Sequence, residues 1–162
     1  MDRWIEIAPL QQVDYHDLSM MVGELLDEIM NRINARVFQR NQQETEATLK
    51  DLIAGNRYWV FVARNSSSRT NIGFVSVYEG HALYTQGAFG VIPELYVRPD
   101  WRCNQAGKML LDQVCRFARD KGWRRIEVTT PPLPEFDRTL SFYRNNGFEI
   151  TGGRKLKIDI EP

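Results

Sequence analysis

The sequence predicts an α/β fold in which helices flank a central mixed β-sheet. Short apolar runs of strand length are interspersed with longer segments whose apolar residues recur every three or four positions, as on one side of a helix. The resulting order is β, α, α, three strands, α, β, α and two closing strands, which favours a sheet covered by helices. With 162 residues the chain has the length of one domain, so residues 1–162 are expected to fold as a single unit.

The N-terminal third is predicted to contain one strand and two helices. Residues Trp4–Leu10 alternate apolar and polar side chains, as a strand with one buried face does. Asp14 or Asp17 can cap the helix that follows, which carries apolar residues at helical spacing. Those residues are Leu18, Val22, Leu25, Ile29 and Ile33. A second helix, Gln43–Ala54, ends at Gly55-Asn56, a pair typical of helix C-termini.

Three strands are predicted in the middle of the chain. Tyr58–Ala63 is a continuous apolar run, which is typical of a strand buried on both faces. The polar loop Asn65–Asn71 connects it to a hairpin partner over Ile72–Gly80. The pattern from His81 to Gly90 is less regular and indicates a strand end and a loop. Val91–Val97 is the third strand.

The remaining elements are predicted from clear stop signals. An apolar-faced helix runs from about Gln105 to Lys121, where Gly122 ends it. Arg124–Thr130 is a strand, and a proline-rich turn separates it from the short helix Thr139–Asn145. The last segment, Phe148–Ile160, is predicted to close the chain as a β-hairpin.

The composition argues against several classes of protein. The 21 basic and 21 acidic residues give a formal net charge of zero, whereas a dedicated nucleic-acid binder usually has a basic surplus. No apolar run approaches the ~20 residues of a membrane span, and the N-terminus lacks the pattern of a secretory signal. Only two cysteines are present, without a CxxC pair, which argues against a disulfide framework or a metal site. We therefore expect a reduced, cytoplasmic enzyme or binding domain.

The stretch YVRPDWRCNQAGKMLL, Tyr96–Leu111, has the features of a phosphate-binding loop. Pro99 ends strand pairing because it has no N–H group to donate. The next helix begins with backbone N–H groups that lack intrahelical partners, and these groups bind anions together with the helix dipole. Gly107 offers close approach to a ligand, and Arg102 and Lys108 add positive charge. The alternative interpretation is a plain strand-to-helix turn with a solvated arginine.

Two motifs resemble those of a known family. The segment VRPDWRCNQAGKMLLDQVCRFARDKGW places Val97, Pro99, Arg102 and Gly107 in the register V-x-P-x-x-[RQ]-x-x-G-x-[GA] and ends in Lys121-Gly122. It resembles the cofactor segment of the GNAT superfamily of N-acetyltransferases. SFYRNNGFE, Ser141–Glu149, is similar to that family's C-terminal signature FYxxxGF. The main departure is Gln105, which stands where the family usually has its first glycine.

The resemblance implies a GNAT-like fold, a central mixed and mostly antiparallel sheet with about four flanking helices, and use of acetyl-CoA as co-substrate. It implies that main-chain groups of Leu95, Tyr96 and Val97 bind the pantetheine arm. The residues implied to hold the pyrophosphate are Arg102, Cys103, Asn104, Gln105, Ala106, Gly107 and Lys108.

Acetyl transfer to an amine needs a base for the amine and an acid for the departing thiolate. Tyr143 matches the family tyrosine that lies near the cofactor sulfur, and its phenol can donate that proton. The alternative is a half-buried aromatic side chain. Glu94, just upstream of the phosphate loop, is our first choice for the base, with Glu127 and His81 as alternatives. A structural carboxylate is an equally reasonable interpretation of Glu94.

The acceptor is expected to be a primary amine of a small molecule or protein. Glu24, Asp27 and Glu28 would suit a cationic amine, although such charges also characterise a solvated helix face. Two other functions stay open, a non-catalytic CoA-binding regulatory module and a transferase of another acyl group. A nucleic-acid-associated domain that uses Lys121, Arg124 and Arg125 is a third, which the zero net charge disfavours. The family resemblance also implies a homodimer.

Overall fold

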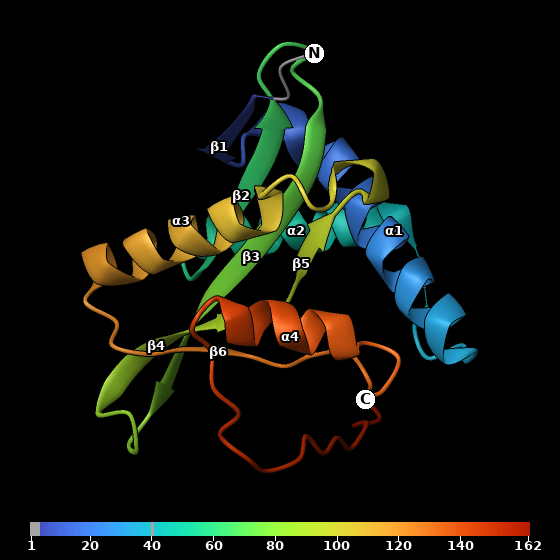
Figure 1. The fold of residues 1–162 in the computed structure, drawn as a ribbon. Helices are drawn as coiled ribbons and strands as arrows, with labels where there is room; N and C mark the ends of the chain where they lie inside the picture. The colour runs from blue at the N-terminus through green and yellow to red at the C-terminus, as the bar shows by residue number, and fades with distance from the viewer. Residues whose placement is uncertain (1–3, 40) are drawn as a thin grey trace.

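The computed structural model describes residues 4–39 and 41–162 and shows a mixed sheet flanked by helices on both faces (Figure 1). Within these residues the sheet has six strands, with the order β1-β2-β3-β4-β6, and β5 pairs with β3. The strands are β1 Ile5–Pro9, β2 Tyr58–Asn65, β3 Asn71–Ala82, β4 Gly87–Ile92, β5 Leu95–Val97 and β6 Ile126–Val128. All pairs are antiparallel except β4 with β6. The predicted fold class is therefore confirmed.

Four α-helices occur in the described part of the chain, as predicted. They are α1 Tyr15–Ile33, α2 Gln42–Ala54, α3 Ala106–Lys121 and α4 Asp137–Asn145, and the short 3₁₀ turns Gln12–Asp14 and Pro99–Trp101 precede α1 and α3. Asn41 caps α2 by accepting a hydrogen bond from the Glu44 amide at 3.1 Å. None of the described helices has the length and apolarity that crossing a membrane requires.

The central strand β2 is buried on both faces, which explains its continuous apolar sequence. Val60 and Val62 pack against Leu18 of α1 and Leu49 of α2. The side chains of Phe61 and Ala63 point to the opposite face of the sheet. Phe61 and Ala63 pack against α3, in a cluster that includes its residues Leu110, Leu111 and Val114. Alternate positions of one strand thus supply two cores, one on each face of the sheet.

The sheet opens between β4 and β5. The sequence predicts one strand over Val91–Val97, but β4 ends at Ile92 and β5 begins at Leu95. Val91 pairs with Tyr78 of β3, and Leu95 pairs with Val75. Leu95 is four residues after Val91, whereas Val75 is only three residues from Tyr78, so this stretch has one residue more than the facing part of β3. This extra residue produces a bulge, and Pro93 has no N–H group to continue the ladder. Just before the break, the end of β4 pairs in parallel with β6.

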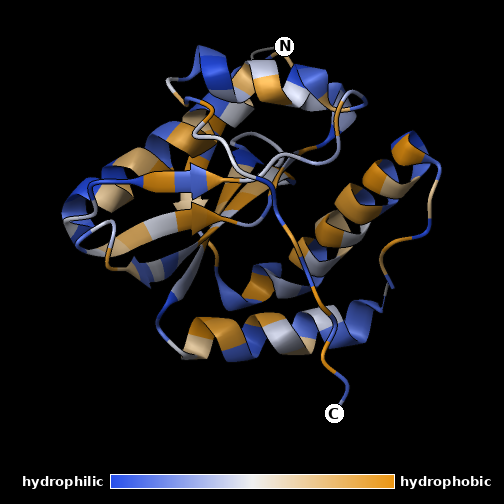
Figure 2. Ribbon diagram, turned by 90° about the horizontal axis from the view of Figure 1, so that it is seen from below, coloured by the Kyte–Doolittle hydropathy of each residue, from blue (hydrophilic) through white to orange (hydrophobic). Residues whose placement is uncertain are grey.

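The predicted C-terminal hairpin is wrong. Residues 148–162 have no regular secondary structure, although apolar and polar residues alternate along them to the C-terminus (Figure 2). Leu156, Ile158 and Ile160 are 90%, 83% and 81% exposed. Alternation is a local property, but a strand forms only where a neighbouring edge accepts and donates its backbone hydrogen bonds. No such partner is present for this segment within the described chain.

Candidate functional site

A cavity of about 690 Å³ lies where the sheet opens. Its walls come from the β4–β5 junction, the loop before α3, the first turn of α3, and residues of α1 and α4. The predicted site residues that line it are Glu94, Leu95, Tyr96, Val97, Arg102, Cys103, Gln105, Ala106, Gly107, Lys108 and Tyr143. Asn104 is not among the lining residues, and its side-chain amide donates a hydrogen bond to the Arg102 carbonyl at 3.0 Å. Packing thus brings together two motifs that are far apart in the sequence.

The loop before α3 has an unusual backbone. Cys103 and Gln105 have φ values of 62° and 66°, in the left-handed region. Gln105 is the N-cap residue of α3, and its side chain makes no capping hydrogen bond. The first N–H groups of the helix therefore retain the capacity to bind an anion at the cavity wall. The left-handed conformation also explains why a glycine would be favoured at position 105.

Replacing Gln105 by glycine is expected to stabilise the protein by about 0.5–1 kcal/mol. A left-handed conformation costs a residue with a side chain about 1–2 kcal/mol, and glycine avoids this cost. The greater backbone freedom of glycine in the unfolded chain lowers the gain in stability by about 0.5–1 kcal/mol. Urea unfolding monitored by circular dichroism measures the change. The matched control is Gln113→Gly in the same helix, which should lose about 1 kcal/mol. Equal losses in both variants would contradict this account of Gln105.

Gly107 is needed for packing within the protein. A Cβ atom at this position would lie 3.0 Å from the Phe142 ring of α4. From the sequence, this glycine is expected to offer close approach to a ligand. The structure shows a second reason, because α4 approaches the first turn of α3 over the missing side chain.

Arg102 is engaged within the protein. Its two terminal nitrogens donate to the two carboxylate oxygens of Glu28 at 2.7 Å each, and Nε donates to the Val97 carbonyl at 2.8 Å. The hydrogen bond from Arg102 lowers the pKa of Glu28. Arg102 thereby ties the loop to both α1 and the end of β5. Its positive charge is already balanced by Glu28. Backbone amides are therefore the main groups of the loop that can donate hydrogen bonds to an anion.

Other basic residues at this cavity were missed by sequence reasoning. Arg138, in the first turn of α4, lines the cavity and forms no ion pair with the described residues. Arg32 of α1 also lines it, donates to Glu28 at 2.8 Å and lies over the Phe136 ring. Neither belongs to a recognisable motif. The only available signal was the position of Arg138 just before the FYxxxGF-like segment.

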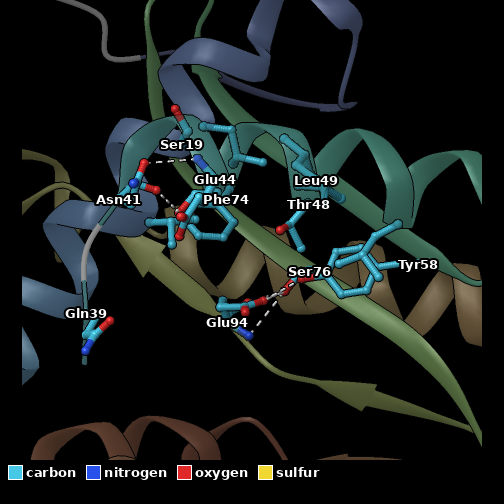
Figure 3. A pocket seen from close by; sticks show the side chains of 15 residues that line it. Ser19, Gln39, Asn41, Glu44, Thr48, Leu49, Tyr58, Phe74, Ser76 and Glu94 are labelled. Carbon is cyan, nitrogen blue, oxygen red and sulfur yellow. Dashed lines mark hydrogen bonds between the residues drawn. The ribbon is translucent and has the colours of Figure 1, made fainter. Parts of the chain in front are cut away.

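Glu94 is held by two hydroxyl groups. Tyr58 donates to its Oε2 at 2.7 Å, and Ser76 donates to the same oxygen (Figure 3). Its own amide donates to the Ser76 hydroxyl at 3.2 Å. Burial, together with the Glu94 carboxylate, raises the pKa of Tyr58 well above its ordinary value. Tyr58 therefore stays protonated and keeps Glu94 oriented, while no described residue donates a hydrogen bond to Oε1.

A second cavity, of about 280 Å³, also has Glu94 in its wall. It is enclosed by α1, α2 and the strands β2 and β3, and Figure 3 shows Glu94, Ser76 and Tyr58 on its strand side. Among the described residues, Glu94 alone lines both cavities. Glu94 is thus a wall residue common to the two cavities.

The other two candidate bases lie away from both cavities. Glu127 accepts hydrogen bonds from the Tyr84 hydroxyl and from Arg125 Nε, both at 2.8 Å. His81 is exposed on β3 and lies 3.3 Å from Glu79. Neither lines a cavity. The geometry therefore favours Glu94 over these alternatives.

The acidic residues of the first helix are also paired. Arg98 donates to Glu24 at 3.1 Å and to Asp17 at 3.0 Å, and Glu28 binds Arg102 as described. A cationic ligand would have to compete with these arginines. The helix face predicted to attract a cationic acceptor instead attaches α1 to the end of β5 and the loop.

Tyr143 lies at the cavity wall between the rings of Phe142 and Phe148, with ring centroids 5.4 Å away on each side. It is only 5% exposed, and burial raises the pKa of its hydroxyl well above the ordinary value. No described residue forms a hydrogen bond with that hydroxyl. Tyr143 is therefore a neutral donor available to a group that enters the cavity.

Comparisons with known proteins agree with this architecture. Residues 55–150 match the family model described as acetyltransferase (GNAT) domain. Among curated proteins, none matches the sequence. In the described part of the chain, no cluster of His, Cys, Asp and Glu side chains could hold a metal ion.

Three similar solved structures illustrate the fold. An acetyltransferase from Trypanosoma brucei has a TM-score of 0.73 at 20% identity, over 97% of this chain and all of that one. Glucosamine-6-phosphate N-acetyltransferase from Arabidopsis thaliana has a TM-score of 0.73 at 15% identity, over 96% and 98% of the chains. AAC(6')-Iy, in complex with the bisubstrate analog CoA-S-monomethyl-acetylneamine, has a TM-score of 0.78 at 17% identity, over 97% and 99%.

Proposed function

Since the chain belongs to the GNAT acetyltransferase family, we propose that it transfers an acetyl group from acetyl-CoA to a primary amine of a small molecule or protein. The observation that carries this proposal is that Glu94 lines two cavities. One cavity has a helix N-terminus and a neutral tyrosine on its wall. The other cavity shares Glu94 with it, so an acceptor and an acyl donor bound in the two cavities would approach each other directly in a ternary complex.

The larger cavity suits acetyl-CoA. The amides at the start of α3 and the side chains of Lys108 and Arg138 would hold its phosphates. Main-chain groups of Leu95, Tyr96 and Val97 would hold the pantetheine arm. A structural neighbour was solved with a CoA bisubstrate analog, which supports a ligand of this kind. Acetyl-CoA supplies the activated thioester.

The residues around the junction can perform the proton transfers. Glu94 accepts a proton from the ammonium group of the acceptor, which makes its nitrogen nucleophilic. A carbon–nitrogen bond forms, the carbon–sulfur bond breaks, and the nitrogen loses a second proton to solvent. Tyr143 donates a proton to the departing thiolate and regains one from solvent. Glu94 then releases its proton to solvent, so in total one proton is released for each acetyl group transferred.

Replacing Tyr143 by phenylalanine is expected to lower kcat by about 10- to 100-fold, because the thiolate then leaves without a proton donor. The affinity for acetyl-CoA should stay within about twofold, since the ring that packs between Phe142 and Phe148 is kept. Steady-state kinetics and calorimetry give the two quantities. Tyr84→Phe removes an exposed hydroxyl elsewhere and is the matched control. An unchanged kcat would remove Tyr143 from the mechanism.

The proposed function itself is tested by measuring free thiol released from acetyl-CoA across a panel of amines. Turnover with any amine supports an acetyltransferase. Binding of acetyl-CoA without turnover supports the alternative of a non-catalytic regulatory module. Turnover only with a longer acyl-CoA supports transfer of another acyl group.

We also propose that the chain forms a homodimer that covers its C-terminal segment. Leu156, Ile158 and Ile160 lie on one side of the chain when it is extended, and a row of exposed apolar residues usually marks an interface. Light scattering is expected to give the mass of a dimer, and replacing all three residues by asparagine should give a monomer. Leu83→Asn, at another exposed position, is the control. A monomeric wild-type protein would contradict the proposal.

Two of the three basic residues that the nucleic-acid interpretation invoked have partners within the protein. Lys121 Nζ lies 4.5 Å from the centre of the Trp59 ring, and Arg125 donates to Glu127. These contacts favour a structural role over a nucleic-acid surface. The cytoplasmic location stays a prediction.

A further inference from the structure

The second cavity has the chemistry to select a class of acceptor. At about 280 Å³ it lies just below the range of about 300–1,000 Å³ that is usual for pockets of drug-sized ligands. It therefore fits a compact molecule, or one end of a larger one. Asn41, Glu44 and Thr48 form the wall on the side of α2, and Glu94 lies on the strand side (Figure 3).

The charged residues of the described chain that line this cavity carry one sign. Two carboxylates line it, Glu94 from the β4–β5 junction and Glu44 from the first turn of α2. None of the lining residues that the structure describes is Lys, Arg or His. Unlike Glu24 and Glu28 of α1, these two carboxylates form no ion pair with a described residue. A hollow lined by one sign of charge concentrates ligands of the opposite sign.

The region between the two carboxylates is apolar at its base. The apolar lining residues are Leu18, Val22, Leu49, Leu52, Val60 and Phe74. Of these, Phe74 and Leu18 are almost fully buried. Neutral hydroxyl and amide groups, including those of Thr48 and Gln39, complete the walls. A saturated carbon chain would lie against the apolar base, with polar ends directed to the carboxylates.

We propose that the acceptor is a small amine that carries two cationic groups, such as an α,ω-diamine. One amino group reaches Glu94 Oε1, where it loses its proton and becomes acetylated. The second ammonium group stays charged beside Glu44, and the carbon chain between them contacts Phe74 and its apolar neighbours. This inference rests on the proposed function only for the acetylation step, because selective binding of the diamine is a separate property of the cavity.

The test compares unbranched α,ω-diamines of three to eight carbons with monoamines of the same length. Calorimetry on the protein saturated with CoA measures amine binding, and thiol release from acetyl-CoA measures turnover. Wild-type protein is expected to bind the best diamine at least tenfold more tightly than the matched monoamine. Glu44→Gln should remove about fivefold or more of that difference, since it removes one charge without changing the size of the side chain.

Glu46→Gln is the matched control. Glu46 lies on the same helix, pairs with Lys50 at 3.2 Å and does not line the cavity, so its replacement should leave the preference for diamines unchanged. Equal binding of diamines and monoamines, or a preference that survives Glu44→Gln, would overturn the inference, while turnover with monoamines would leave the proposed function in place. Diamine binding that depends on Glu44 without any turnover would support the inference and contradict the proposed function. Absence of amine binding to the folded protein would overturn the inference.

Discussion

Replacing Gly107 by glutamate is expected to abolish binding of acetyl-CoA, with a loss of at least 100-fold in affinity. The new carboxylate would lie in the first turn of α3, where unpaired N–H groups and the helix dipole favour an anionic ligand. Its charge would repel phosphates at the cavity wall. Its bulk would also displace Phe142, because even a Cβ atom here would lie 3.0 Å from that ring. Isothermal calorimetry with acetyl-CoA measures the loss.

Two further variants separate charge from packing. Gly107→Ala adds only the crowding against Phe142 and should cost stability with a much smaller loss of affinity. Gln105→Glu keeps the size of the side chain and adds one negative charge to the loop, so it should weaken acetyl-CoA binding without changing the packing of α4. Thermal unfolding verifies that each variant is folded. If both glutamate variants fold and bind acetyl-CoA as the wild type does, the loop does not hold the phosphates.

Replacing Glu94 by glutamine is expected to lower kcat by about 100- to 10,000-fold, the range that removal of a general base produces. Glutamine retains an oxygen that can accept the hydrogen bonds of Tyr58 and Ser76, so the local structure should persist. It cannot take up a proton from the amine. The affinity for acetyl-CoA should change by no more than about twofold.

Glu127→Gln is the informative comparison for this prediction. Glu127 was an alternative base in the sequence, but its carboxylate is bound to Tyr84 and Arg125 outside both cavities. We expect its replacement to leave kcat unchanged. If turnover falls for Glu127→Gln and persists for Glu94→Gln, the assignment of the base passes to Glu127.

Several features of the site could be predicted because they depend on neighbours in the chain. The loop before α3 was located by the residues of its own segment, and α3 ends at Lys121 before Gly122, as expected. Tyr143 was found from a short motif, and the cavity contains it. The prediction failed for Phe148–Ile160, where the alternating pattern is strand-like but no sheet edge pairs with it. It also missed the break at Pro93, which depends on how β3 pairs with two different strands.

The sequence by itself determined the four helices, most of the strands and the family, because periodicity, helix ends and short motifs are properties of adjacent residues. The tertiary structure alone decided which groups meet. Glu94 is 36 positions from Tyr58 and 18 from Ser76, and Arg102 is 74 positions from Glu28. These contacts depend on the bulge in the sheet and on the packing of α1 across it, which no local pattern encodes. For the same reason only the structure shows that Glu28 balances the charge of Arg102 and that Glu94 lines two cavities.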